Sequence, residues 1–390
     1  MTLYIGDKRI CPIIKVKGND TQGEFLVTVI DYDGTVLYQD HLNTGAKVYM
    51  PPAPSHDGLT FLAWSAAQPI LNDGTNDYVE VNGQDITVGA TYDTRQGTTE
   101  FDITLNENTG LTVTLKMSGT KYWGDGTSDP TNVQSHTYEN YGDYTIVCDG
   151  TSWGSNSSSG GLFGQSSSAI NWYVKSIRIG SRVTSMNSSY MFQYCSGLKS
   201  VILPTKARPM GSYIFRNCNN LRAAVIPYGC TSMGSYDFYA NNNMVYIVIP
   251  STVTTLNSNV FNGLSRLRSF TFPPSITTMA SGVLQSCSSL ERIKLPDGAY
   301  TLNTSALYSL GGIKYLKFPV KTNIPSQFCS AARNCEVFDF TDYTSVPTLA
   351  NVNAFSTISP IAVFKIPSSL LDEWKAASNW STYANQMVGV

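Results

Sequence analysis

Short apolar strands, each closed by a proline, recur at a fixed spacing through the second half of the chain. The stretch YIVIPSTVTTLNSNVFNGLSRLRSFTFPPS, residues 246–275, holds two of them. Proline lacks a backbone N–H, so it is tolerated where a strand ends rather than inside a sheet. The stop recurs every 23 residues, at Pro204, Pro227, Pro250, Pro273, Pro296 and Pro319. The residues before each proline are apolar at alternate positions, which predicts one short strand per unit.

Three further columns of apolar residues keep the same period. The first is Phe192, Phe215, Phe238, Phe261, Leu284 and Leu307; the second is Leu198, Leu221, Met244, Leu267, Leu290 and Ile313; the third is Met210, Met233, Leu256, Met279 and Leu302. A fixed period of this length predicts a solenoid, in which each unit offers a strand and an apolar corner that only its neighbours can bury.

These units, which read F..C..L..I.IP...T.I, resemble BspA-like leucine-rich repeats of bacterial and some protozoan surface proteins. The resemblance covers residues 171–367. It implies a curved solenoid with a parallel sheet on one face. The final strand, Phe364–Pro367, follows two residues out of phase, so the last unit departs from the family's spacing.

Two small β modules are expected before the solenoid, which makes the predicted fold class mainly β. Residues 24–94 alternate apolar and polar positions around the turn DYDGT, and run through GLTFLAWS to ITVGATY. This order resembles the Listeria–Bacteroides repeat, a β-grasp-like module of surface proteins, and implies that Trp64 is a structural core residue.

Residues 95–150 contain KYWGDGTSD and then SHTYENYGDYTIVCDG. They resemble a PKD-like β-sandwich, and the matching residues are Trp123, Gly124, Asp125, Gly126, His136, Tyr138 and Tyr144. Asp125 and Asp129 offer too few oxygen ligands for calcium. We expect His136 to be a hydrogen-bonded structural histidine rather than a member of a catalytic pair with Asp125.

Three segments connect or close these units. Residues 1–23 form an N-terminal arm without the uninterrupted apolar core of a signal peptide, and the arm resembles those of tail or baseplate proteins of phages of gut bacteria. The Ser/Gly-rich residues 151–170 predict a flexible linker or a loop over the first repeat. Helical spacing is found at Leu370, Leu371, Trp374, Ala377 and Trp380, so 368–390 predicts a helix that caps the solenoid.

Enzymatic and membrane-spanning classes are disfavoured. The chain has three histidines, His41, His56 and His136, none within a hydrolase, metalloprotease or P-loop motif. We therefore expect no catalytic residues, cofactor or metal. No apolar run reaches 18 residues, so no membrane span is expected. Cys195, Cys218 and Cys287 share one repeat column and are expected in the core.

Charge is divided unevenly between the halves of the chain. Residues 1–170 hold 8 Lys and Arg against 20 Asp and Glu, a net charge of −12, whereas residues 171–390 hold 18 against 8, a net charge of +10. This division predicts two different partners, one of them polyanionic.

Strand positions that point away from the core are apolar in the early repeats and basic and aromatic in the late ones. The predicted ligand-binding face comprises Lys199, Arg222, Tyr246, Arg268, Arg292, Lys294, Lys314, Tyr315 and Lys317. One interpretation is a docking face for an anionic glycan or an acidic protein. The other is a set of solvated charges that resist sheet aggregation.

Two functions are compatible with these features, and neither is enzymatic. One is a phage or prophage virion component, a tail or fibre protein whose repeats bind a glycan or protein of the bacterial surface. Its arm would contact other virion proteins, and a homotrimer is expected by analogy with tail fibres. The alternative is a secreted or cell-surface BspA-like adhesin that binds host matrix or other cells. Nucleic acid is not an expected partner, because no nucleic-acid-binding fold motif is present.

Overall fold

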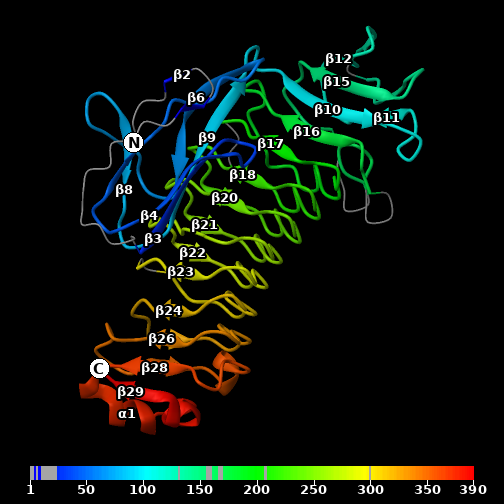
Figure 1. Ribbon diagram of the computed structural model, residues 1–390. Coiled ribbons are helices and arrows are strands. Elements are labelled where there is room, and N and C mark those ends of the chain that lie inside the picture. The colour runs from blue at the N-terminus through cyan, green and yellow to red at the C-terminus, as the bar shows by residue number, and fades with distance from the viewer. Residues whose placement is uncertain are drawn as a thin grey trace.

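The chain folds mainly into β-strands that build a curved solenoid with two β modules at its N-terminal end (Figure 1). The computed structural model describes residues 24–130, 132–154, 160–165, 170–205, 209–297 and 300–390, together with two short strands, β1 (Tyr4–Ile5) and β2 (Lys8–Arg9). Apart from these strands, the predicted arm, residues 1–23, lies outside the described residues.

Most repeats of the solenoid place one short strand on a common face, and the paired strands run parallel; residues 269–271 have no assigned strand. They are β16 (Val174–Arg178), β17 (Ser200–Ile202), β18 (Ala223–Val225), β20 (Tyr246–Val248), β23 (Arg292–Lys294), β24 (Tyr315–Lys317), β26 (Val337–Asp339), β28 (Val363–Ile366) and β29 (Met387–Gly389). We call the outward side of these strands the strand face. A second series of two-residue strands follows the prolines: β19 (Ser232–Met233), β21 (Thr255–Leu256), β22 (Thr278–Met279), β25 (Asn323–Ile324) and β27 (Thr348–Leu349). The predicted solenoid of stacked units is confirmed.

The apolar columns form continuous ladders inside the solenoid. Phe192, Phe215, Phe238 and Phe261 are buried and stack with successive ring-centroid distances of 5.4, 5.4 and 6.2 Å. One repeat alone would leave both ring faces in water, so stacking is what buries them. The cysteine column is buried as free thiols, and burial raises the pKa of Cys287 to about 12.

The turn opposite the strand face bends at two residues in the left-handed conformation, four positions apart. Tyr236 and Ala240 have φ of 61° and 58°, and one repeat later Asn259 and Gly263 have φ of 57° and 84°. A residue with a Cβ is strained in this region by roughly 1–2 kcal/mol. The repeats accept this strain because the bend aligns the apolar ladder.

The first module, residues 24–94, consists of two sheets. Strands β3 (Phe25–Ile30), β4 (Val36–Leu42), β6 (Leu59–Ala66) and β9 (Ile86–Thr94) form a sheet in the order β4-β3-β9-β6, with β3 and β9 parallel at its centre. Strands β5 (Lys47–Tyr49), β7 (Leu71–Asn72) and β8 (Asp77–Glu80) form the other sheet. Trp64 is buried between them, in the core where its pattern places it.

The second module, residues 95–150, shares a sheet with the solenoid. It contains β10 (Thr99–Leu105), β11 (Thr112–Thr114), β12 (Lys121–Tyr122), β13 (Ser128–Asp129), β14 (Ser135–Thr137) and β15 (Gly142–Cys148). Strand β10 pairs with β15 on one side and antiparallel with β16 of the first repeat on the other. The sheet therefore runs without a break from the module into the solenoid.

The segments predicted as linker and cap differ in detail from expectation. The described part of 151–170 is packed: Leu162 and Phe163 are buried, and Leu162 N–H donates to Met191 O at 2.8 Å, as in a loop over the first repeats rather than a flexible linker.

The prediction that a single helix spans 368–390 is wrong. This segment forms the 3-10 helices η2 (Ser368–Leu370) and η3 (Trp380–Gln386), the short α-helix α1 (Leu371–Ala376) and strand β29. Another 3-10 helix, η1 (Val352–Phe355), precedes β28.

The terminal segment still closes the apolar core. Trp374 and Trp380 are fully buried, and their rings lie 5.4 and 5.6 Å from the ring of Phe340. A short helix suffices because β29 continues the parallel sheet and brings the chain back over the last repeat.

Candidate functional site

The first module packs onto the strand face of the early repeats and covers its apolar part. Ile202, Val225 and Val248 point outward from β17, β18 and β20 but are each at most 5% exposed, because Ile30 and the sheet around it lie on them. Figure 1 shows the module beside these repeats, with β24 to β29 extending past it.

The contact is close enough to require glycine. A Cβ built on Gly89 of β9 would lie 2.5 Å from Val225 Cγ2, and one built on Gly34 would lie 2.9 Å from Ala223 Cβ. Hydrogen bonds fix the contact at both ends: Ser65 Oγ donates to Ile226 O at 2.7 Å, and Thr271 Oγ1 donates to Asp85 O at 2.6 Å. The module is thus held by packing and by paired polar groups.

Charge also joins the front half of the chain to the solenoid. Arg178 of β16 donates through Nε to Glu100 Oε2 at 2.8 Å and through Nη2 to Asp102 Oδ1 at 2.9 Å, both on β10. Arg292 donates to Glu24 O at 2.8 Å. The uneven charge division therefore serves, at these contacts, to bind one half of the molecule to the other. The prediction of two different partners, one of them polyanionic, stays a prediction.

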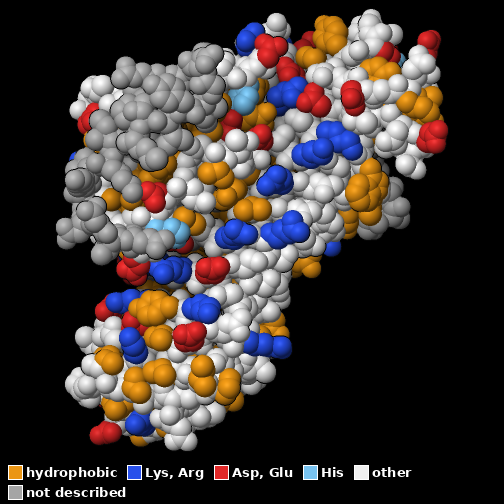
Figure 2. Space-filling view, viewed as in Figure 1, with side chains coloured by type: hydrophobic (Ala, Val, Ile, Leu, Met, Phe, Trp, Pro, Cys, Tyr) orange, Lys and Arg blue, Asp and Glu red, His pale blue; other side chains and the backbone are white. Residues whose placement is uncertain are grey.

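Docking leaves a groove of about 610 Å³ at the edge of the first module. One wall is the start of β3 with the turn Gly83–Asp85, and the other is the strand face of β23 and β24 with the chain that follows them. The space-filling view shows blue and red side chains close together in this region (Figure 2). Neither wall forms the groove alone.

The basic side chains of the groove are paired with carboxylates. Lys317 Nζ lies 2.8 Å from Asp342 Oδ2, Lys294 Nζ lies 3.9 Å from Asp297 Oδ2, and Lys314 Nζ lies 3.7 Å from Glu336 Oε1. The hydrogen bond to Asp342 raises the pKa of Lys317. A groove lined by such pairs offers donors and acceptors of both signs rather than a uniformly positive surface.

Tyr315 presents the exposed aromatic ring of the groove. Its side chain is 42% exposed, whereas Phe270 and Phe318 in the groove lining are buried. Its hydroxyl donates to Asp339 Oδ2 across the neighbouring strand β26. Burial, and after it the bond to Asp339, raise the pKa of Tyr315. The ring is therefore fixed in orientation before any ligand arrives.

The structure divides the predicted binding face into three parts. Arg292, Lys294, Lys314, Tyr315 and Lys317 line the groove. Lys199, Arg222 and Arg268 are exposed before their strands in earlier repeats, away from it. Tyr246 does not belong to an open face, because it is half-buried against the cluster that Ile30 of the first module forms with Val225 and Val248 of the solenoid.

Sequence reasoning missed Glu24 and Asp85, which belong to the other wall of the groove. The signal that could have revealed the docking was the outward apolar column Ile202, Val225 and Val248. A solvated strand face rarely carries contiguous apolar residues.

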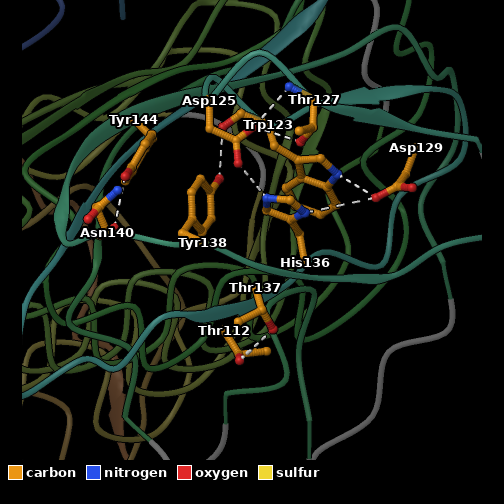
Figure 3. Close-up of polar contacts among 10 residues, drawn as sticks. All are labelled: Thr112, Trp123, Asp125, Thr127, Asp129, His136, Thr137, Tyr138, Asn140 and Tyr144. Atoms are coloured by element: carbon orange, nitrogen blue, oxygen red, sulfur yellow. Dashed lines mark hydrogen bonds and ion pairs between the residues drawn. The ribbon is translucent and has the colours of Figure 1, made fainter.

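The histidine of the second module has a structural environment (Figure 3). His136 stacks on Trp123 at 4.9 Å, and its Nε2 lies 2.7 Å from Asp125 Oδ2. Trp123 Nε1 donates to Asp129 Oδ2 at 2.9 Å, and Tyr138 hydroxyl donates to Trp123 O at 2.8 Å. Burial opposes ionisation of Asp125, but hydrogen bonds from Thr127 and His136 lower its pKa to about 2. The network holds the turn WGDGT against the rest of the second module.

Comparison with known proteins gives the family of the solenoid. The pattern of the BspA type leucine-rich repeat region matches six copies over residues 168–290 and 257–374, together more than half of the chain. The chain belongs to this family. Leucine-rich-repeat proteins are in general recognition proteins rather than enzymes, and BspA-like members are secreted or at the cell surface. The match leaves out residues 1–167, so the resemblances of the two front modules and the arm remain predictions.

No curated protein matches the chain. Among solved structures, a leucine-rich repeat protein from Bacteroides ovatus is 20% identical over 59% of this chain and 61% of its own, with a TM-score of 0.44. The T. pallidum leucine-rich repeat protein is 14% identical over 59% and 94%, with a TM-score of 0.34. A leucine-rich cell surface protein from Faecalibacterium prausnitzii is 17% identical over 46% and 62%, with a TM-score of 0.26. The matched part thus spans less than two thirds of the first structure's chain.

Proposed function

We propose that this protein is a non-enzymatic surface-recognition protein, an adhesin that acts at the cell surface or after secretion and binds host matrix or other cells. The observation that carries the proposal is the groove between the first module and the late repeats. The early part of the strand face is used for docking inside the molecule, so the groove is where the face stays accessible. Membership of the BspA-type family supports the adhesive role.

The groove suits a polar ligand of low net charge, such as a surface glycan. The rigid ring of Tyr315 offers a flat apolar surface for a sugar ring. Lys294 with Asp297 and Lys317 with Asp342 place donors and acceptors beside it for hydroxyl groups. Its lining holds five Asp and Glu, namely Glu24, Asp85, Glu291, Asp297 and Asp342, against four Lys and Arg, so an anionic ligand gains little there.

Binding of the full chain to immobilised mammalian matrix proteins and to intact bacterial cells tests this function. Tyr315→Ala should weaken binding about tenfold or more, because a central aromatic anchor commonly contributes more than about 1 kcal/mol. Tyr141→Ala is the matched control, since Tyr141 is 51% exposed but lies on the second module. Equal binding by both variants and the parent would place recognition outside the groove.

The phage-tail hypothesis remains a separate prediction. It depends on the resemblance of residues 1–23, and the family match does not reach that segment. Binding to bacterial envelopes alone, with none to matrix proteins, would favour it over the host adhesin. Among the described residues, no helix has the length and apolar character needed to cross a membrane.

A further inference from the structure

A second positively charged surface lies on the flank of the solenoid, separate from the groove. Lys175, Lys199, Arg222 and Arg268 occupy one column of the repeats, in which Val245 stands between Arg222 and Arg268, and we call these four residues the flank ladder. Lys199 N–H donates to Lys175 O at 2.8 Å, so these residues occupy adjacent levels of the stack. Figure 2 shows basic side chains following one another along the solenoid between the second module and the groove.

The flank ladder differs from the groove in its lack of counter-charges. Lys199, Arg222 and Arg268 are exposed, and no described carboxylate lies within ion-pair distance of them. Lys175 is half-buried and donates to Trp172 O at 2.6 Å. Burial lowers the pKa of Lys175, and the nearby charge of Lys199 lowers it further. The charge of Asp143 partly offsets this shift at Lys175. Lys199, Arg222 and Arg268 are the members of the flank ladder without an ion-paired carboxylate among the described residues.

Protection against aggregation does not explain these charges. Such protection places charged residues on the unpaired edge strands of a sheet. Strands β17 and β18, which follow Lys199 and Arg222, are paired with β16 and β20 inside the stack. Each of these strands lies within the stack of repeats, not at an end of the solenoid, so the basic side chains beside them are not placed as guards of its terminal strands.

We propose that the flank ladder binds a linear polyanionic polymer of sugar or polyol units whose sulfate or phosphate groups run along the solenoid axis. Successive levels of a stacked sheet lie roughly 4.8 Å apart, so the four levels separating Lys175 from Arg268 span roughly 19 Å. Arg266, exposed beside Arg268, adds a further cation at the far end, and Glu291 ends the run one repeat later. A chain with an anionic group on most sugar or polyol units can meet several of these cations at once.

A pair of charge-matched double variants of the full chain tests the proposal. Lys199→Ala with Arg222→Ala removes two unpaired cations from successive repeats. Lys294→Ala with Lys317→Ala removes two cations that lie in register on β23 and β24 but are paired with carboxylates. Binding is measured to immobilised heparin and to poly(glycerol phosphate) from about 50 to 300 mM salt.

The variant Lys199→Ala with Arg222→Ala should bind at least one of these polymers about tenfold more weakly than the parent. The slope of log affinity against log salt concentration should fall in magnitude by roughly 1.4, or about 0.7 for each lost contact. The groove variant should bind like the parent. Equal weakening of both variants would reduce the effect to net charge and overturn the proposal, as would failure of the parent to bind either polymer.

The choice of polymer identifies the source of the ligand. Binding to heparin alone supports a sulfated animal glycan, and binding to poly(glycerol phosphate) alone supports a bacterial envelope polymer. Equally strong binding to a single-stranded oligonucleotide of the same charge would overturn the assignment of a sugar or polyol polymer. Tyr315→Ala should leave heparin binding unchanged, so the flank ladder and the groove can fail independently.

Discussion

Replacing Gly89 by alanine tests the docking of the first module most directly. The added methyl group would lie 2.5 Å from Val225 Cγ2 and 2.8 Å from its Cγ1, well inside van der Waals contact. Gly89 is paired to Ile30 on one side and to Ser65 on the other, so its backbone cannot retreat. Overpacking of this kind costs about 1–3 kcal/mol, and we expect Gly89→Ala to lower the free energy of unfolding by that amount.

Combining Gly89→Ala with Val225→Ala measures whether the two residues are in contact. Val225→Ala removes two methyl groups at about 0.8 kcal/mol each, so alone it should cost about 2 kcal/mol. In the double variant the new methyl of residue 89 enters the space that Val225 vacates. The double variant should therefore be more stable, by about 1 kcal/mol or more, than the sum of the single effects predicts.

Urea unfolding of the parent, both single variants and the double variant gives the four free energies. Gly142→Ala is the control, because Gly142 also lies in a strand, but its added Cβ would meet nothing closer than 3.7 Å. That control should be neutral or slightly stabilising. Additivity of the Gly89 and Val225 effects within about 0.5 kcal/mol would show that the two residues do not touch, which would refute the docked arrangement.

Three further predictions concern stability. Burial raises the pKa of Asp237 to about 8, although the N–H groups of Ile214 and Gly234 donate to its carboxylate. The protonated side chain therefore stabilises the fold fully below about pH 4, and this stabilisation is lost as pH rises to about 8. Urea unfolding across this pH range should show a free energy of unfolding that depends less on pH in Asp237→Asn than in the parent, and an equal pH dependence would contradict this. Ala240→Gly should raise Tm, because glycine removes the strain of about 1 kcal/mol that a Cβ causes in the left-handed conformation of residue 240. A lowered Tm would mean that packing of the Ala240 methyl group stabilises the fold by more than this strain costs. The pKa of Asp125 is lowered to about 2, so its ionised carboxylate stabilises the second module above about pH 4, and this stabilisation is lost as pH falls to about 2. Tryptophan fluorescence should therefore show a weaker acid transition in Asp125→Asn than in the parent.

The groove shows how far sequence reasoning reaches. Lys294, Tyr315 and Lys317 were predictable as outward strand residues, because alternation within a strand is a local property. Their carboxylate partners Asp297 and Asp342 follow a few residues later, but which cation each one meets depends on the turn geometry. The acidic wall at Glu24 was not predictable, because Arg292 meets it across 268 residues of chain.

The sequence alone determined the solenoid, its period and its core columns, because each repeat interacts mainly with the next and the same pattern recurs many times. The parallel sheet was expected only from the family resemblance. The sequence also determined that the chain ends in a cap, although it overstated the helix. Tertiary structure decided which part of the strand face stays open. That outcome depends on the fit of Gly89 to Val225 and on hydrogen bonds such as Ser65 to Ile226, between residues 161 positions apart. Non-local packing of this kind leaves no period in the sequence, so only the folded molecule shows that the apolar repeats are covered and the basic ones are not.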